Sequence, residues 1–455
     1  MLKSLDFTSS HIPSLIRKLA VPASVGFIFN TLFNVVDTYW GGKISTSALA
    51  AMGLTFPVFF IILSMGIGMG TGTTALISQS LGAGRNDEAE KYGFQAISFS
   101  IINSVFLTVI GLVIAPSLFL ILGATNEYLE IAIQYMDIIL YGTVFFLTDS
   151  ILNSLLTSRG DTRTYRNYLI VGFFLNVILD PWFMYGGFGF PALGIRGIAL
   201  ATVMIQVFGM TYLIIITRKR KIFQHARFKD FIPNRKYFAD LFGQGFPASL
   251  NMLTVAIGIF VITYFASQFG KEAVAAYGIA TRIEQIALLP TIGLNIAALT
   301  LAGQNMGAGL PERVFMSWKL NIRYGLMIIS IGVVGVAVFA RELIHAFTAD
   351  IKVIEIGAEY LHIAVLFFFA YVFLNISVST LQGMKKPLYA IFVGAYRQFL
   401  VPLPLFLFLA IYLQWGTKGI WWGIFIANWS AAIFTFFYTR RQIMKLLHPT
   451  SLTND

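Results

Sequence analysis

The most constraining feature of this chain is a series of long apolar stretches that fills almost all of it. Most of them have about 20 or more residues, the length that an α-helix needs to cross the hydrocarbon core of a bilayer. Because lipid offers no partners to backbone N–H and C=O groups, only helices and closed barrels can span it. We therefore expect an all-α polytopic membrane protein with twelve transmembrane helices, at residues 19–40, 52–80, 92–121, 128–157, 165–185, 194–217, 238–269, 275–304, 317–340, 353–380, 388–412 and 417–439.

The composition agrees with this expectation and excludes several functions. Charged residues make up 12% of the 455 residues and the mean hydropathy is +0.76, whereas soluble domains have about 25% charged residues. The chain has no cysteine, which excludes disulfides, thiolate zinc sites and iron–sulfur clusters. Neither a phosphate-binding loop nor an HExxH or GxSxG site is found, and there are only five histidines. We therefore do not expect an enzyme.

Basic residues indicate the orientation in the membrane. The net charge is +11, but the Lys and Arg residues are concentrated in short loops between apolar spans, so they do not indicate nucleic-acid binding. Cytoplasmic loops carry the excess of Lys and Arg, and this rule places both termini in the cytoplasm. The positive residues then left on the outer side are few: Lys43, Arg196, Lys271, Arg341, Lys352 and Lys418.

Short motifs recur at one constant spacing. Pro-Ala-Ser at 22–24 returns at 247–249, an alanine-rich segment at 48–53 returns at 273–278, and Gly-Ala-Gly at 82–84 returns at 307–309. Each pair is separated by 225 residues (247 − 22, 273 − 48 and 307 − 82). The chain is therefore interpreted as a duplication of a six-helix half, and self-similarity of this kind indicates a repeat architecture.

The duplication predicts the domain organisation. We expect an N-lobe at 1–217, a basic cytoplasmic linker at 218–236 and a C-lobe at 237–455. Because six is even, both halves start on the same side of the membrane and form a parallel repeat. Transporters built from such halves bind substrate at the interface of the repeats and rock around it. The architecture therefore favours a transporter.

Two carboxylates interrupt the apolar spans of the first half. Asp37 and Asp180 both lie near the predicted outer ends of outward-running helices, so we expect them at similar depth. Asn176 lies four residues before Asp180 and shares its helical face, and Thr202 lies at a similar depth on the next helix. Such a group of oxygens could share a proton or coordinate Na⁺. The alternative for Asp37 is a simple helix end beside Gly41.

Other charged residues in the spans leave structural and functional alternatives open. Asp149 either joins a proton relay or pairs with Arg159 near the membrane surface. Arg282 and Glu284 are two residues apart and face different directions, so each needs another partner. Arg397 needs an acid or several carbonyl groups. A structural role is the favoured interpretation for all of these residues.

The paired Pro-Ala-Ser and Gly-Ala-Gly motifs, together with the two six-helix halves, resemble the multidrug and toxic compound extrusion (MATE) transporters along essentially the whole chain. The acids Asp37 and Asp180 make the chain most similar to the DinF-like branch. That resemblance adds Pro22 as the position where the first helix bends, and Asn153 and Asn176 as members of the cation site. The NorM-like branch carries acids on the seventh and tenth helices, and the central parts of those helices have none here.

The resemblance implies a secondary antiporter that exports organic, often cationic, compounds in exchange for H⁺. Na⁺ is the alternative coupling ion, with Asp37, Asn176 and Asp180 as its ligands, and no other cofactor is expected. A flippase for lipid-linked oligosaccharides is the alternative function, but it needs several intramembrane cations for a pyrophosphate. We expect a monomer in the plasma (inner) membrane of a prokaryote, with drug-like small molecules and the lipid bilayer as its partners.

Overall fold

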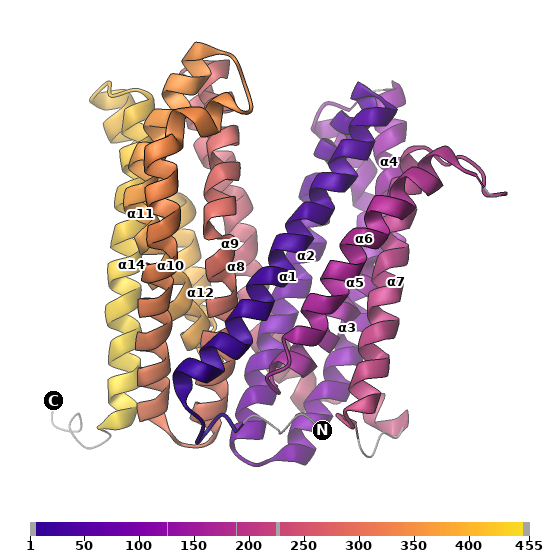
Figure 1. The fold of residues 1–455 in the computed structure, drawn as a ribbon, viewed down its shortest axis with the longest axis vertical. Helices are drawn as coiled ribbons and strands as arrows, with labels where there is room; N and C mark the ends of the chain where they lie inside the picture. The colour runs from indigo at the N-terminus through magenta and orange to yellow at the C-terminus, as the bar shows by residue number, and fades with distance from the viewer. Residues whose placement is uncertain (1–5, 125, 188, 224–227, 449–455) are drawn as a thin grey trace. The chain divides into compact units, whose positions relative to one another are not determined.

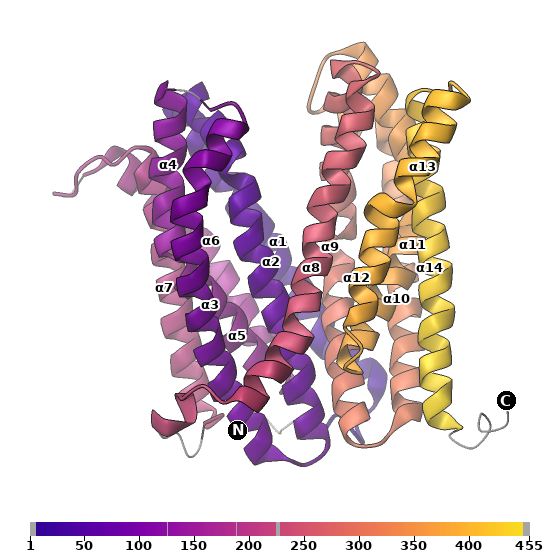
Figure 2. The ribbon, with the colours of Figure 1, turned by 180° about the vertical axis from the view of Figure 1, so that it is seen from behind.

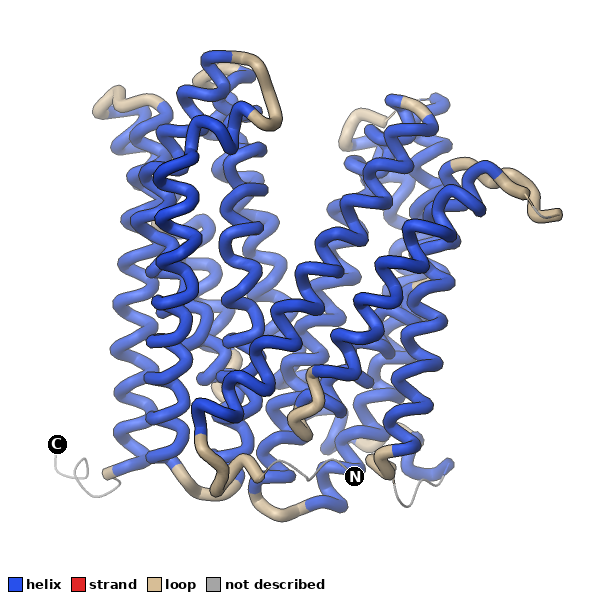
Figure 3. The backbone as a smooth tube through the Cα atoms, viewed as in Figure 1, coloured by secondary structure: helices blue, strands red, loops and turns tan. Residues whose placement is uncertain are grey.

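The structure, a computed structural model, describes residues 6–124, 126–187, 189–223 and 228–448, and within these ranges it is almost entirely helical (Figure 3). Eleven helices are long and apolar enough to cross a membrane, and Tyr128–Tyr141 with Thr143–Thr157 makes a twelfth span if this bent pair is counted as one. The expected all-α polytopic fold is confirmed. The helices are α1 (Ile12–Ile44), α2 (Thr46–Gly82), α3 (Asn86–Ile121), α4 (Asn126–Tyr141), α5 (Thr143–Thr157), α6 (Arg163–Tyr185), α7 (Ile195–Lys219), η1 (Phe228–Phe231), α8 (Arg235–Ser267), α9 (Lys271–Gly307), α10 (Pro311–His345), α11 (Ile351–Gly383), α12 (Leu388–Ala395), η2 (Tyr396–Leu400), α13 (Pro402–Phe406), η3 (Leu407–Tyr412) and α14 (Thr417–Leu447).

The chain forms two compact units. Unit 1 consists of Met1–Ser24, Gly82–Gly84 and Leu250–Asp455, and unit 2 consists of Val25–Leu81 and Arg85–Ser249. Helices α1 and α8 therefore each change unit along their length, at positions 225 residues apart (249 − 24). The predicted boundaries of the lobes and of the linker at 218–236 stay predictions, and residues 224–227 of that linker lie outside the described residues.

In unit 1 the most buried membrane-spanning helix is α11, which packs against α9, α10 and α14 (Figure 1). Its Phe367 and Phe368 side chains are completely buried. The first part of α1 contributes Leu15, Ile16 and Leu19 to the same apolar core. Burial of these side chains fixes the start of α1 in unit 1, ahead of the segment that carries Asp37.

In unit 2 the glycine-rich part of α2 sets the spacing of its neighbours. The Ser150 and Ser154 hydroxyls of α5 donate to the carbonyl oxygens of Gly66 and Gly70, at 2.6 and 2.9 Å. Glycines four residues apart lie on one helical face and allow this close approach. On another face of α2, a Cβ at Gly68 would collide with the backbone of Ser249 in α8.

The sequence repeat also appears in the packing of unit 1. There Ser24 of α1 donates to the carbonyl of Pro290 at 2.8 Å and accepts from the backbone N–H of Gly293 at 3.2 Å. Gly293 is the repeat partner of Gly68 (293 − 68 = 225), and Ser24 is that of Ser249. The same Ser–Gly contact therefore occurs once in each unit, as expected for a duplicated six-helix half.

Two spans depart from regular α-helix geometry. Helices α4 and α5 meet at a bend of 44° around Gly142, where a Cβ would collide with the Val203 side chain of α7. In the eleventh span the backbone widens, so that the Val401 N–H donates to the carbonyl of Tyr396, five residues earlier, at 3.0 Å. Pro402 and Pro404 follow directly and cannot donate α-helical hydrogen bonds. Figure 2 shows this widened span alongside α14.

The close packing of α2 predicts that adding one methyl group at Gly68 lowers the stability of the protein. Because the Cβ of Gly68→Ala would meet backbone atoms of Ser249, overpacking should destabilise the protein by about 1–3 kcal/mol. The matched control is Gly53→Ala in the same helix, where a Cβ would meet no atom within 4 Å. Thermal unfolding of the two detergent-solubilised variants, followed by intrinsic fluorescence, checks this. Equal midpoints would contradict the proposed packing.

Candidate functional site

The candidate site lies inside unit 2, where α1, α6 and α7 meet. Its members are Asp37 on α1, Asn176 and Asp180 on α6, and Thr202 on α7. All four are buried, with Asp37 6% exposed and Asp180 fully buried. An ionised carboxylate at membrane depth costs at least about 2.5–3.5 kcal/mol and is usually functional. Burial of two acids in one place is therefore the first sign of a built site.

Each oxygen of the Asp37 carboxylate has a donor from a different helix. The Asn176 amide donates to Asp37 Oδ1 at 2.7 Å, and the Thr202 hydroxyl lies 3.2 Å from Asp37 Oδ2. The same Thr202 hydroxyl also lies 3.1 Å from the carbonyl of Ile198, one turn earlier on α7. These bonds attach α1 to both α6 and α7 through a single carboxylate.

Asp180 faces Asp37 but has no hydrogen-bond donor of its own among the described residues. The two carboxyl groups lie within side-chain contact of each other, yet neither oxygen of Asp180 accepts a hydrogen bond from a donor among the described residues. The Asn176 Oδ1 atom is likewise without a described donor. Ionised carboxylates only accept hydrogen bonds. The contact between the two acids therefore becomes a hydrogen bond when one of them holds a proton.

The structure brings together the four residues that the sequence placed at one depth, and it separates one predicted member from them. Asn153 lies on α5, where its Oδ1 accepts from the Thr157 hydroxyl at 3.1 Å, and no described hydrogen bond joins it to Asp37 or Asp180. Pro22 lies inside α1, fifteen residues before Asp37 (37 − 22). The roles of all these residues in ion coupling stay predictions.

The sequence analysis missed Tyr135 of α4. This side chain is 9% exposed and lies within electrostatic range of both Asp37 and Asp180. Its hydroxyl is a further proton donor and acceptor beside the two acids. No pattern in the α4 sequence distinguishes Tyr135 from the core aromatic residues around it, because its place depends on how α4 packs against α7.

The oxygen atoms of the site fit either a proton or a small cation. Among the described residues, no group of three or more His, Cys, Asp or Glu side chains could hold a metal ion. Asp180 and the Asn176 amide together offer three oxygens without a described donor. A sodium ion would take these three with further oxygens, whereas a proton needs only one oxygen from each acid.

Unit 1 holds a separate cluster of polar side chains around Glu284 of α9. The Tyr360 hydroxyl of α11 donates to Glu284 Oε2 at 2.6 Å, and Tyr371 lies against the same carboxyl group. Arg397 lies 5.3 Å from the centre of the Tyr371 ring and 3.4 Å from the Asn428 Oδ1 atom to which it donates. The partners of Glu284 and Arg397 therefore come from other helices, and Arg397, besides its ring and amide contacts, lies within electrostatic range of the acid Glu284.

Arg282 is exposed on α9 and forms no ion pair within the described part of the chain. Arg159 does not pair with Asp149 in that part either, and its guanidinium donates to the Leu155 carbonyl at 3.1 Å. The expected pairing of Asp149 with Arg159 is therefore wrong in this structure. Arginine at this position instead satisfies a carbonyl of its own helix end.

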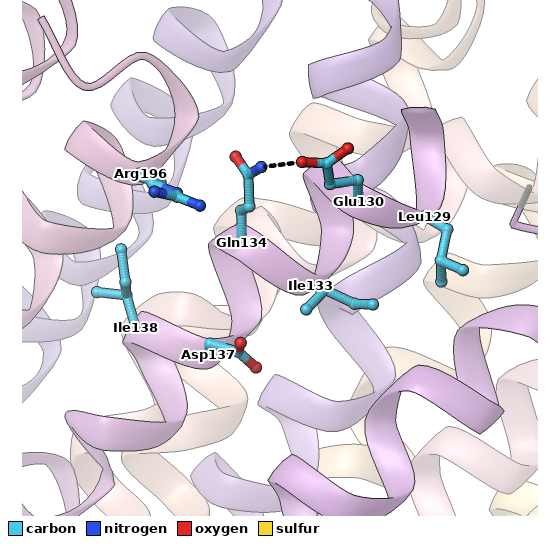
Figure 4. Close-up of a pocket in the computed structure, with 7 residues that line it drawn as sticks. All are labelled: Leu129, Glu130, Ile133, Gln134, Asp137, Ile138 and Arg196. Atoms are coloured by element: carbon cyan, nitrogen blue, oxygen red, sulfur yellow. Dashed lines mark hydrogen bonds between the residues drawn. The ribbon is translucent and has the colours of Figure 1, made fainter. Parts of the chain in front are cut away.

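An open pocket of about 520 Å³ lies elsewhere in unit 2, along α4 (Figure 4). Gln134 donates to Glu130 there at 2.9 Å, and Arg196 of α7 lies within electrostatic range of Asp137. Its lining includes none of the four members of the candidate site. We therefore assign the candidate site to the buried carboxyl pair and not to this pocket.

Comparison with known proteins gives matches along almost the whole chain. The MatE family matches residues 22–182 and 247–407, two segments separated by the same 225 residues as the motifs (247 − 22 and 407 − 182). An FAD transporter of Shewanella oneidensis is 28% identical over 95% of each chain. The probable multidrug resistance protein NorM of Thermotoga maritima is 27% identical over 90% of this chain and 88% of its own.

The solved structures agree with the fold. The outward-facing conformation of a multidrug resistance MATE family transporter of the MOP superfamily superposes with a TM-score of 0.92. It is 27% identical in sequence, and the match covers 98% of this chain and 99% of that one.

The contacts of Glu284 predict that removing its side chain destabilises the protein more than removing that of Arg282. Glu284→Ala leaves the buried Tyr360 hydroxyl without its acceptor, so we expect a loss of about 1–3 kcal/mol in the free energy of unfolding. The matched variant is Arg282→Ala, whose exposed side chain should contribute less than about 0.5 kcal/mol. Thermal unfolding in the same detergent measures both. An Arg282→Ala variant as unstable as Glu284→Ala would show that Arg282 has a structural partner.

Proposed function

The chain belongs to the multidrug and toxic compound extrusion (MATE) family of membrane transporters, and on that premise we propose that it is a secondary antiporter coupled to protons. It is a multi-pass membrane protein that transports compounds, as its relatives do. We propose that it exports organic compounds and that a proton bound between Asp37 and Asp180 drives the export. The observation that supports this most is the contact of two buried acids, one of which accepts no hydrogen bond from a described donor.

The physical argument starts from the two charges. Burial and like-charge repulsion both disfavour ionisation of Asp37 and Asp180 together, and the proton belongs to the pair and not to one residue. Because Asn176 and Thr202 already donate to Asp37, Asp180 is the better proton carrier in this arrangement. Loss of that proton would leave two adjacent negative charges, which either attract a new cation or separate.

A change in the proton content of the pair would act on α1. Asp37 holds α1 to α6 and α7, while Ser24 holds an earlier part of α1 to α9 within unit 1. Between its cytoplasmic start and Ser24 lies Pro22, which cannot donate to the Lys18 carbonyl as a regular helix residue would. Helices kink at such positions. We propose that protonation of the acid pair changes the hydrogen bonds of Asp37 and lets α1 bend at Pro22.

Antiport requires that the proton and the substrate favour different conformations of α1. A ligand that binds both conformations equally does not change the equilibrium between them. One proton crossing a potential of about 100 mV supplies about 2.3 kcal/mol in addition to the pH gradient. Na⁺ remains the alternative ion, since Asp180 and Asn176 offer three oxygens without a described donor. A proton is favoured because it satisfies the carboxyl contact with the atoms already in place.

Several further assignments belong to this proposal. Acids on α1 and α6, with none in the central parts of α8 and α11, support the DinF-like branch. The bias of Lys and Arg supports cytoplasmic termini in a prokaryotic plasma membrane. Substrate trials should include cationic drugs and also a flavin nucleotide, because one relative is an FAD transporter. A monomer is the working assembly, and a lipid-linked oligosaccharide flippase is the alternative function.

The proposal predicts the effect of neutralising either acid. Asp37→Asn and Asp180→Asn preserve the shape of the side chain but cannot titrate, so export driven by a proton gradient should fall to the level of liposomes without protein. Asp161→Asn is the matched control, because Asp161 pairs with Arg220 at 2.8 Å outside this site. The measurement is efflux from proteoliposomes at equal protein content. Gradient-driven efflux at the wild-type rate in both variants would refute the assignment of the site.

The proposed bend at Pro22 predicts a kinetic effect. Pro22→Ala restores one backbone hydrogen bond to straight α1, worth about 0.5–1.5 kcal/mol, so transport should slow by about two- to tenfold with unchanged substrate affinity. The matched variant is its repeat partner Pro247→Ala in α8, which precedes no comparable acid pair and should have less effect. Efflux rates and equilibrium binding separate the two quantities. Faster transport in Pro22→Ala would contradict the hinge.

A further inference from the structure

A third buried carboxylate of unit 2, Asp149 on α5, has no part in the site described above. Its side chain is 2% exposed. The neighbouring residues Ser150 and Ser154 bond to backbone carbonyls of α2, and this contact fixes the rotation of α5. Asp149 consequently presents its carboxyl group on a different face of α5, where it lies against the Tyr168 hydroxyl of α6.

Tyr168 has only one hydroxyl proton, and that proton is already donated in a hydrogen bond. The buried Tyr168 hydroxyl donates to Gln206 Oε1 of α7 at 2.8 Å. Neither oxygen of Asp149 accepts a hydrogen bond from a donor within the described ranges. A hydrogen bond between Asp149 and Tyr168 in this arrangement therefore requires Asp149 to be the donor, which means that its carboxyl group holds a proton.

The other groups around Asp149 do not neutralise a charge. The titratable groups that face it are Tyr165 and Tyr168, both from α6. From α3 the uncharged Ser100 lies 3.5 Å from Thr148, the residue before Asp149. Two serine hydroxyls of α5 donate to glycine carbonyls of α2, and α7 contributes the uncharged Gln206, which bonds to Tyr168. No described Lys or Arg forms an ion pair with Asp149, and a buried unpaired carboxylate is costly.

We propose that Asp149 is a second proton-binding site of unit 2, and that Tyr168 transmits its protonation state to Gln206. When Asp149 loses its proton, the Tyr168 hydroxyl rotates its own proton from Gln206 to the carboxylate, because a hydrogen bond to a charged acceptor is the stronger one. The hydrogen bond between α6 and α7 is then lost. The one covalent bond that breaks is the O–H bond of Asp149, whose electron pair stays on the carboxylate and whose proton leaves to water.

The position of this hydrogen bond links it to the carboxyl pair. Gln206 and Thr202 are four residues apart on one face of α7, about 6 Å along the helix. Tyr168 and Asn176 are eight residues apart on α6, about two turns. The Tyr168–Gln206 bond and the two donors of Asp37 therefore lie along the same α6–α7 interface. A change in one contact biases the spacing of the helices at the other.

The test measures protonation directly, so that it does not depend on transport. Infrared spectra of the full-length protein in lipid report the carbonyl stretch of protonated carboxylic acids, recorded as a function of pH. We expect Asp149→Asn to lose one such band that wild-type protein and Asp161→Asn retain, and we expect the band to disappear reversibly as the pH is raised. Tyr168→Phe should keep the band but change its frequency.

Two outcomes would overturn the proposal: an Asp149→Asn spectrum with every wild-type carboxylic acid band, or a band that never titrates. If Asp149→Asn does not fold, the frequency change in Tyr168→Phe decides, and an unchanged frequency counts against the proposal. The inference rests on the proposed proton coupling and extends it, but the two can be disproved by different experiments. Loss of coupling in Asp37→Asn tests the first site, whereas the Asp149 band tests only the second.

Discussion

The structure of unit 2 depends on how two buried carboxyl groups are kept together in a membrane-spanning segment. Asp37 receives its two donors from α6 and α7, and Asp180 meets it from α6 without a donor among the described residues. In water this pair would separate and ionise. At membrane depth the same pair holds three helices at one level, and its proton content decides whether that arrangement is stable.

The duplicated architecture explains why such a pair can act on the rest of the chain. The contact of Ser24 with Gly293 in unit 1 repeats the contact of Ser249 with Gly68 in unit 2. Helices α1 and α8 each pass from one unit to the other close to these serines. Only α1 carries an acid beyond its serine: the repeat partner of Asp37 in α8 is Ile262 (37 + 225). The two halves therefore share a scaffold, and the titratable pair makes them different.

Much of the fold and part of the site could be predicted from the sequence. The lengths of the apolar stretches predicted the membrane spans, and the directions of the helices predicted that Asp37, Asp180 and Thr202 lie at one depth. Both predictions depend only on distances along the chain. The bend at Gly142 and the position of Tyr135 could not be predicted, because both depend on the packing of α4 and α5 against α7. The pairing of Asp149 with Arg159 was wrong because Arg159 bonds to its own helix end. Asn153 was inferred from family resemblance and lies on a different helix from the donors of Asp37.

The most direct test of proton coupling is efflux from proteoliposomes in which proton and sodium gradients are imposed separately at zero membrane potential. A proton shared by Asp37 and Asp180 predicts that an inward proton gradient alone drives export of a transported compound. It also predicts that an inward sodium gradient at equal pH drives none. Export driven by sodium with no proton gradient would contradict this account and would make the oxygens of Asp180 and Asn176 that lack a described donor a sodium site.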